Sequence, residues 1–335
     1  MANKKFTVTA SPHAHSSETT TGIMLDVIIA LLPAAVVSVV FFGVKAFAVI
    51  ATTVLSCVLF EYLSRKIMKR SNTLGDLSAI VTGLILAFNL PSTIPLWMAV
   101  IGSFIAIVIV KQMFGGIGMN FVNPAITARI ILMSSFPVAM STWTQPLVTK
   151  SSGTDALTSA SPLALLAGVC NKTTTLEEAG LPSLKDMFLG LRPGSLGEVC
   201  AVALLIGFVY LLIRKVISPI IPLCFIGTVA VFMLIAGRGD LRFVAYQLLS
   251  GGLLLGAIFM ATDYTTSPIN RKGKVIFGIG CGLITCVIRY FGTLPEGVSF
   301  SIIIMNILVP HIESLTTPKP FGEVKEKKEK EAKAA

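Results

Sequence analysis

Ten apolar runs dominate this chain of 335 residues. A helix needs about 20 mostly apolar residues to cross the hydrocarbon core of a membrane, so each run is a candidate span. The runs cover residues 24–42, 46–63, 77–90, 94–110, 125–140, 199–213, 217–236, 243–261, 275–291 and 298–312. Several are short and interrupted by Gly, Pro or Asn, notably the third and the fifth. We therefore expect broken helices there, which in membranes usually line binding sites.

The composition points to the same class of protein. Hydrophobic residues make up 54% of the chain and charged residues only 13%, whereas a soluble domain carries roughly 25% charged residues. This excludes a soluble enzyme, a secreted disulfide scaffold and a nucleic-acid-binding module. The net charge of +10 is explained by basic cytoplasmic loops, so the lipid bilayer is the expected partner and nucleic acid is not.

The distribution of Lys and Arg predicts the orientation. Basic residues gather in the segments that share a side with the two termini, which places both termini in the cytoplasm. These inner residues are Lys4, Lys5, Arg65, Lys66, Lys69, Arg70, Lys111, Arg214, Lys215, Arg271, Lys272, Lys274 and the lysines from Lys319 onward. Seven basic residues fall outside, and four of them belong to one long loop.

The two halves of the chain resemble each other. TGLILAFNLPSTIP in the third run parallels GGLLLGAIFMATDYTTSP in the eighth, and an offset of five helices inverts the second copy. We expect an all-α polytopic membrane protein of about ten transmembrane helices in an inverted five-plus-five repeat with broken helices. Its parts are a cytoplasmic segment (1–22), the first repeat (23–140), an outer loop (141–197), the second repeat (198–313) and a charged cytoplasmic tail (314–335).

The sequence predicts neither a catalytic residue nor a metal site. It contains no G-x-S-x-G, H-E-x-x-H or P-loop motif, its three histidines lack partners at ligand spacing, and no two of its six cysteines form C-x-x-C. Four charged residues, Asp26, Arg129, Glu198 and Arg289, fall in or beside apolar runs. Each could belong to an ion pathway, although snorkelling and pairing between helices are commoner explanations.

The outer loop contains a hydroxyl-rich stretch, DALTSASP, at residues 155–162. In one interpretation it is a turn in which Ser161 caps a short helix that starts at Pro162. In the other it is a covalent attachment point, because the N-terminus of a helix stabilises a phosphoester.

Residues 155–161 are similar to the flavin-attachment motif D-x-x-[S/T]-G-A-[T/S]. Ser159 stands where the motif has Gly, and Ser161 replaces the commoner Thr while keeping the hydroxyl. Between residues 11 and 311 the chain also resembles the NqrB/RnfD family, the RnfD branch most closely. The stretches that carry this resemblance are SPHAHSSETTTGIMLDVIIALLPA, GGIGMNFVNPA, RPGSLGEVCAVALLIGFVYLLIRKVI and FMATDYTTSP.

The resemblance implies that a flavin transferase links FMN through its phosphate to Ser161, with Asp155, Thr158 and Ala160 completing the motif. It also implies a noncovalent riboflavin in the membrane domain. Asn120, Asn123 and Asp263 are the expected contacts of that riboflavin, because amides can read the edge of an isoalloxazine ring. The alternative is two helix-capping Asn residues and a solvated Asp.

The resemblance further implies an electron-transfer subunit of an Rnf-type ferredoxin:NAD oxidoreductase that moves Na⁺ or H⁺, with the other Rnf subunits as partners. It would lie in the cytoplasmic (inner) membrane with the flavin-attachment loop on the outer face. The alternative from the residues alone is a secondary transporter or channel with no redox cofactor, since inverted repeats and broken helices are typical of those proteins.

Overall fold

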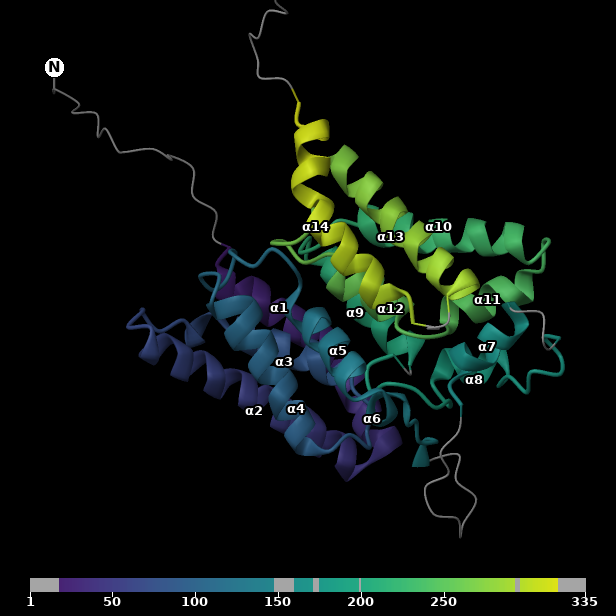
Figure 1. The fold of residues 1–335 in the computed structure, drawn as a ribbon, viewed down its shortest axis with the longest axis horizontal. Coiled ribbons are helices and arrows are strands. Elements are labelled where there is room, and N and C mark those ends of the chain that lie inside the picture. Colours follow the sequence, from purple (N-terminus) through teal and green to yellow (C-terminus); the bar gives the residue numbers. More distant parts are fainter. Residues whose placement is uncertain (1–17, 148–159, 171–174, 199, 293–295, 319–335) are drawn as a thin grey trace, which may run out of the picture.

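The computed structural model describes residues 18–147, 160–170, 175–198, 200–292 and 296–318, and the regular elements in them are helices (Figure 1). The first half contains α1 (Thr20–Phe42), α2 (Val44–Ile67), the short η1 (Leu74–Asp76), α3 (Ser78–Phe88), α4 (Leu96–Phe104), the π-helix η2 (Ile105–Gln112), α5 (Pro124–Ser135) and α6 (Pro137–Ser141). The connecting segment contains α7 (Pro162–Cys170) and α8 (Leu184–Leu189).

The second half contains α9 (Ala201–Ile213), α10 (Ile220–Ala236), α11 (Leu241–Leu249), α12 (Leu253–Leu255), the π-helix η4 (Gly256–Met260), α13 (Arg271–Phe291) and α14 (Val298–Thr316). Each of the ten predicted runs coincides with one helix or with consecutive helices. Among the described residues, α1, α2, α13 and α14 are long and apolar enough to cross a membrane unaided. The expected all-α polytopic class is confirmed.

A break that was not predicted from the sequence lies in the eighth run, between α11 and α12. The helical segments on its two sides are bent by 66°. Gly251 stands at the break with a φ of 65°, a left-handed conformation that glycine adopts without steric cost. The polar main-chain groups exposed by such a break must be satisfied by protein or must line a cavity.

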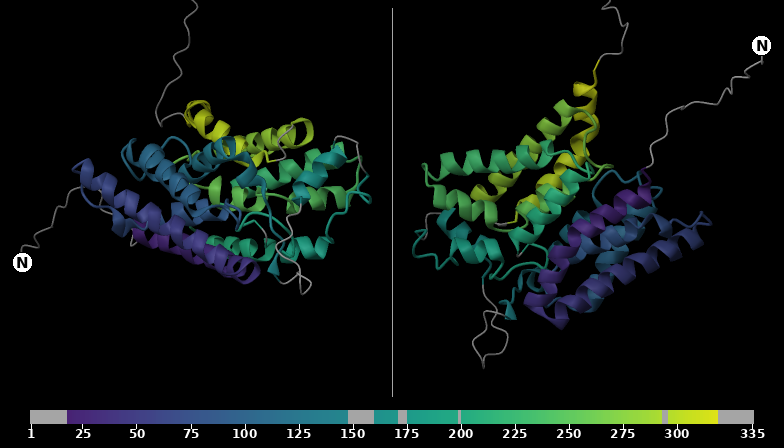
Figure 2. Two further views of the ribbon diagram at one scale, coloured as in Figure 1. Left: turned by 60° about the horizontal axis from the view of Figure 1, so that its bottom comes forward. Right: turned by 180° about the vertical axis from the view of Figure 1, so that it is seen from behind.

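Equivalent helices of the two halves make equivalent contacts. The first helices, α1 and α9, contact each other, as do the fifth helices, α5 and α14. The second helix packs against the fourth in both halves, α2 against α4 and α10 against α13. Figure 2 shows the two halves side by side along this seam. These contacts agree with the inverted repeat expected from the sequence.

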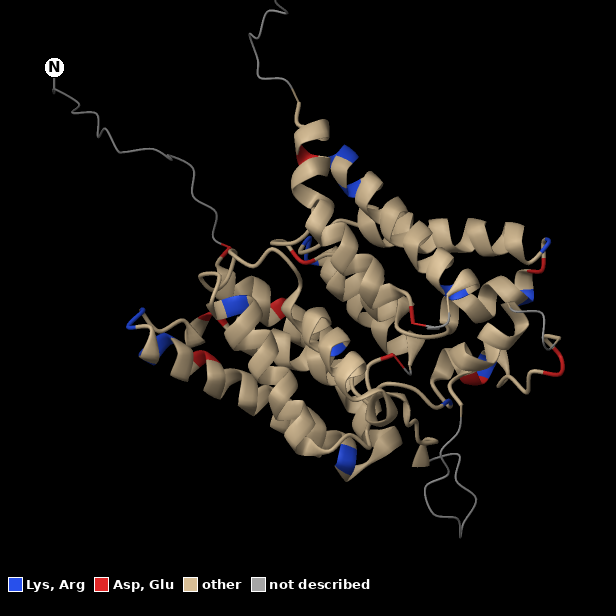
Figure 3. Cartoon of the chain, in the orientation of Figure 1, with Lys and Arg blue, Asp and Glu red and all other residues tan. Residues whose placement is uncertain are grey.

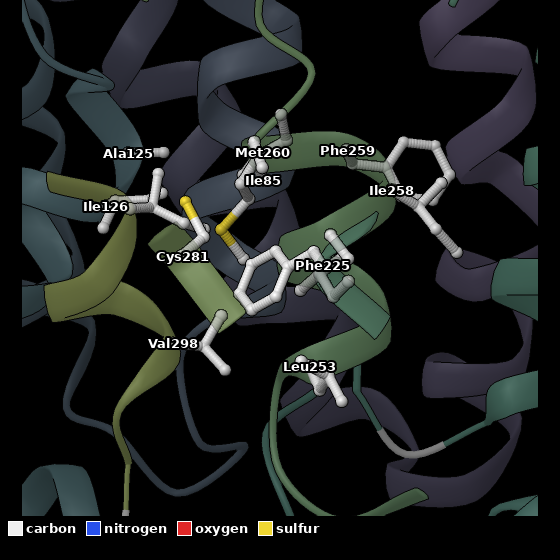
Figure 4. Packing of buried hydrophobic residues seen from close by; sticks show 14 of the residues in the cluster. Ile85, Ala125, Ile126, Phe225, Leu253, Ile258, Phe259, Met260, Cys281 and Val298 are labelled. Carbon is white, nitrogen blue, oxygen red and sulfur yellow. The ribbon is translucent and has the colours of Figure 1, made fainter. Parts of the chain in front are cut away.

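The core of the molecule forms where the two halves meet. Figure 4 shows side chains of α3, α5, α10, α12, η4, α13 and α14 packed together. Phe225, Leu253, Ile126 and Cys281 are completely buried there. Because lipid offers no hydrophobic driving force between helices, such packing depends on close van der Waals contact.

The outer faces of the helices are apolar. Val36 and Val40 on α1, Leu55 on α2 and Ile235 on α10 are each at least 60% exposed. Most charged residues lie at helix ends and in loops, as Figure 3 shows. Apolar flanks and charged ends are the pattern that a bilayer requires of its spanning helices.

Candidate functional site

A cavity of about 340 Å³ lies between α1, α3, η2 and the segment that follows η4. Asn120, Asn123 and Asp263, the three residues expected to contact riboflavin, all line it. We call it the inner cavity, because it lies at the helix ends that join the predicted cytoplasmic loops. The structure therefore brings together three residues that come from two distant parts of the sequence.

Asn123 is the N-cap of α5. Its Oδ1 accepts hydrogen bonds from the main-chain N–H groups of Ala125 (3.1 Å) and Ile126 (3.3 Å). Its Nδ2 donates to the main-chain oxygen of Met260 at 3.2 Å. The oxygen of the Asn123 side chain therefore caps α5, as the alternative interpretation expects, while its nitrogen links α5 to the end of η4 through a hydrogen bond.

Asn120 and Asp263 leave acceptor atoms at the cavity wall. Nδ2 of Asn120 donates to the main-chain oxygen of Val122 at 3.1 Å, whereas its Oδ1 accepts no hydrogen bond from the described residues. Oδ2 of Asp263 accepts from the hydroxyl of Thr266 at 3.2 Å. Asp263 lies in the loop after η4, where burial raises the pKa of its carboxyl, while Thr266, the Thr265 N–H and Lys111 oppose that change.

Lys111 also lines the inner cavity, and its burial was not foreseen from the sequence. It was expected in a cytoplasmic loop, but it lies in η2 and is only 2% exposed. Its Nζ lies 2.7 Å from Oε2 of Glu61 on α2 and 2.6 Å from the hydroxyl of Ser78. The sequence did contain a sign of this pair, because Glu61 and Lys111 each stand at the end of an apolar run. Lys111 also lies in a π-helix, and π-helices are frequent at functional sites.

Ser161 caps α7 as the first interpretation of the outer loop predicts. Its Oγ accepts a hydrogen bond from the main-chain N–H of Ala164 at 3.2 Å. Ser161 is half-buried and Ala160 is exposed. Asp155 and Thr158 lie outside the described residues. The hydroxyl therefore stands at a helix N-terminus, where main-chain N–H groups favour an anionic group.

The charged residues within the apolar runs are paired or bonded. Asp26 on α1 forms an ion pair with Arg214 (3.2 Å) and accepts from the hydroxyl of Tyr210 (2.8 Å). Arg129 on α5 forms an ion pair with Glu296 at 2.5 Å. Arg289 donates to the main-chain oxygens of Gln247 and Ser250. Sequence reasoning did not single out Glu296, which belongs to no apolar run.

The fold and the site define a polytopic helical membrane protein whose helices border a largely apolar cavity with a few polar side chains, with a hydroxyl at a helix N-terminus in the loop between its halves. The profile of the NQR2, RnfD, RnfE family matches residues 7–322. The chain belongs to this family.

Relatives match nearly the whole chain. It is 46% identical to the D subunit of the Na⁺-translocating ferredoxin:NAD⁺ oxidoreductase complex of Acetobacterium woodii, over 99% of this chain and 100% of the relative. It is 42% identical to the D subunit of the proton-translocating ferredoxin:NAD⁺ oxidoreductase complex of Clostridium ljungdahlii, over 95% and 96%. It is 38% identical to the D subunit of the ion-translocating oxidoreductase complex of Stutzerimonas stutzeri, over 90% and 91%.

Proposed function

We propose that this chain is the membrane electron-transfer subunit of an Rnf-type ferredoxin:NAD oxidoreductase complex that couples redox chemistry to Na⁺ or H⁺ movement. It carries FMN covalently on Ser161 and riboflavin noncovalently in the inner cavity. When bound, the flavins supply the redox chemistry, and the protein supplies their placement and electrostatic environment.

The observation that carries the proposal is the lining of the inner cavity. Asn120 and Asn123 come from one segment and Lys111 and Asp263 from two others, yet all four line one space. Its volume lies in the range of small-molecule sites. The Oδ1 of Asn120, which accepts no hydrogen bond from the described residues, can accept from a ring N–H. The ammonium group of Lys111 is paired with Glu61 at 2.7 Å, so the two together add a dipole and no net charge beside the cavity.

The environment of Ser161 supports the covalent flavin. Its Oγ stands at the first turn of α7, which is nine residues long, and its half-buried position leaves the hydroxyl within reach of a flavin transferase. The phosphoester would stand at the first turn of α7, where the positive end of the helix dipole favours an anionic group.

The two sites support electron transfer across the membrane. The start of α1 and the end of α14 lie on one side of the molecule, together with the inner cavity, while α7 and α8 lie toward the other side (Figures 1 and 2). With both termini cytoplasmic in the inner membrane, riboflavin lies toward the inside and FMN faces outside. Electrons could then pass between them.

The proposal is tested in membranes of a strain that lacks this subunit. Wild-type protein should restore NAD⁺ reduction driven by ferredoxin, whereas Ser161→Ala should insert normally but restore little of it. Ser159→Ala, which keeps the hydroxyl at position 161, is the matched control. Full activity of Ser161→Ala would contradict the proposal. A wild-type protein that contains no flavin would favour the alternative function of a secondary transporter or channel.

A further inference from the structure

Two glutamates are buried together at the break between α11 and α12. Glu198 lies in the turn before α9 and is 6% exposed, and Glu296 lies just before α14 and is 9% exposed. We call them the acidic pair. They come from opposite ends of the second half, and neither belongs to the inner cavity.

One carboxylate oxygen of each glutamate in the acidic pair lacks a hydrogen-bond partner among the described residues, and both oxygens lie close to Gly252. Oε2 of Glu198 and Oε1 of Glu296 each lie 3.3 Å from the position that a Cβ on Gly252 would occupy. Within the described part of the chain, neither oxygen has a hydrogen-bond partner. Nη1 of Arg129 lies 3.4 Å from the same position, so the two carboxylate oxygens and this guanidinium group surround the place where Gly252 has no side chain.

Three buried arginines lie near the acidic pair, and their hydrogen bonds within the described residues go mainly to other groups. Arg129 on α5 binds the other oxygen of Glu296, and its Nη1 donates to Oδ1 of Asn89 at 2.5 Å. Nη2 of Arg192 donates to the main-chain oxygen of Glu198 at 2.7 Å, not to its carboxylate. Arg289 on α13 donates to main-chain oxygens at the end of α11.

The carboxyl group of Glu198 is therefore poorly satisfied for a charged group. Its Oε1 accepts one long bond, 3.4 Å, from the main-chain N–H of Ser195. Removing an ionised carboxylate from water without compensating bonds is costly. The hydroxyls of Ser195 and Ser299, each three residues from one of the glutamates in sequence, are also buried without a partner among the described residues. Oxygen atoms of this kind bind hard cations.

The acidic pair lies between the two proposed flavin sites. On one side, a chain of contacts leads to the inner cavity. Arg129 donates a hydrogen bond to Asn89, and Nδ2 of Asn89 lies 3.7 Å from the sulfur of Met260. The main-chain oxygen of Met260 in turn accepts a hydrogen bond from Asn123. On the other side, a Cβ on Gly251 would lie 2.8 Å from Leu163, two residues after Ser161.

We propose that Glu198 and Glu296 bind one exchangeable monovalent cation, a proton or a sodium ion, at the α11–α12 break. The link between this cation and electron transfer rests on the proposed function, whereas cation binding itself rests on the geometry of the pair.

Infrared difference spectroscopy of the purified full-length protein tests the proposal. One arm titrates pH between about 5 and 9 without Na⁺, the range in which buried carboxyl groups titrate. The other arm adds Na⁺, with K⁺ as control, at fixed pH. Glu198→Gln and Glu296→Gln are compared with Glu177→Gln, a neutralised residue in the exposed outer segment.

If the pair binds a proton, the infrared spectrum should contain a protonated-carboxyl band that shifts in D₂O. This band should disappear in Glu198→Gln or Glu296→Gln and should remain in Glu177→Gln. A sodium site predicts carboxylate bands that respond to Na⁺ and not to K⁺, with the half-saturating Na⁺ concentration raised at least tenfold in the same variants. Wild-type protein that shows neither response overturns the proposal, even if a variant does not fold. The flavin content of the same samples is measured as well. Protein that contains flavin but shows no cation response contradicts the cation site alone, whereas protein without flavin contradicts the proposed function.

Discussion

Asn123 joins two elements through the two ends of one amide. Its oxygen caps α5 and its nitrogen holds the main chain at the end of η4. Both elements border the inner cavity, so this residue shapes the cavity even before any ligand is considered.

We therefore predict that Asn123→Ala greatly lowers the content of noncovalent flavin. Loss of the cap costs about 0.5–2 kcal/mol, and the oxygen of Met260 is left unpaired. Asp263→Asn should keep more flavin, because its shape and one acceptor survive, but should raise the reduction potential of the flavin by removing a negative charge. Extracted flavin is quantified against covalent FMN in each variant. If both variants keep the wild-type riboflavin content and the wild-type reduction potential, Asn123 and Asp263 have a structural role only.

Lys111 and Glu61 form a buried pair whose separate loss leaves a charge unpaired. Lys111→Met should destabilise the protein by about 3–5 kcal/mol, because the carboxylate of Glu61 remains buried. The double variant Lys111→Met with Glu61→Leu should recover most of that loss. Thermal unfolding in detergent measures both. Equal stability of the single variant and the wild type would show that Glu61 is solvated or neutral in the folded protein.

At the scale of elements, the contact between α1 and α9 joins the halves of the molecule. A Cβ on Gly207 in α9 would collide with the main-chain oxygen of Ala30 in α1, whereas a Cβ on Gly227 in α10 meets nothing within 4 Å. Close approach of main chains at a small residue is typical of packing between membrane helices.

Gly207→Ala should therefore destabilise the protein by about 1–3 kcal/mol through overpacking. Gly227→Ala is the matched control and should be neutral or stabilising by up to about 1 kcal/mol, because alanine favours helix more than glycine does. Thermal unfolding of the two variants decides between these expectations. A tolerated Gly207→Ala would mean that α1 and α9 pack less closely than described.

The elements were largely predictable from the sequence, because each apolar run had to become a helix. The break at Gly251 was not predicted, because a glycine in an apolar run is also compatible with close helix packing. Nor were the π-helices, since a change of helical type depends on packing rather than on composition. The burial of Lys111 was not foreseen either, because its partner Glu61 lies 50 positions away. The contact of Arg129 with Glu296, 167 positions apart, had no local signal.

At the scale of the whole molecule, sidedness decides whether the two flavin sites can serve opposite faces of the membrane. Lys185 on α8 and Lys272 on α13 are both exposed. Lys185→Cys should react with an impermeant maleimide only from outside, and Lys272→Cys only from inside. Labelling of both from one face would overturn the topology and the proposed path for electrons.

The most direct test of the proposed function is to count flavins on the purified chain. After acid precipitation, the pellet should hold one FMN per chain, and mass spectrometry should place it on the peptide that contains Ser161. The supernatant should hold one riboflavin per chain. In Ser161→Ala the covalent FMN should be absent and the riboflavin unchanged. A colourless wild-type protein, or FMN that persists in Ser161→Ala, would contradict the proposed function.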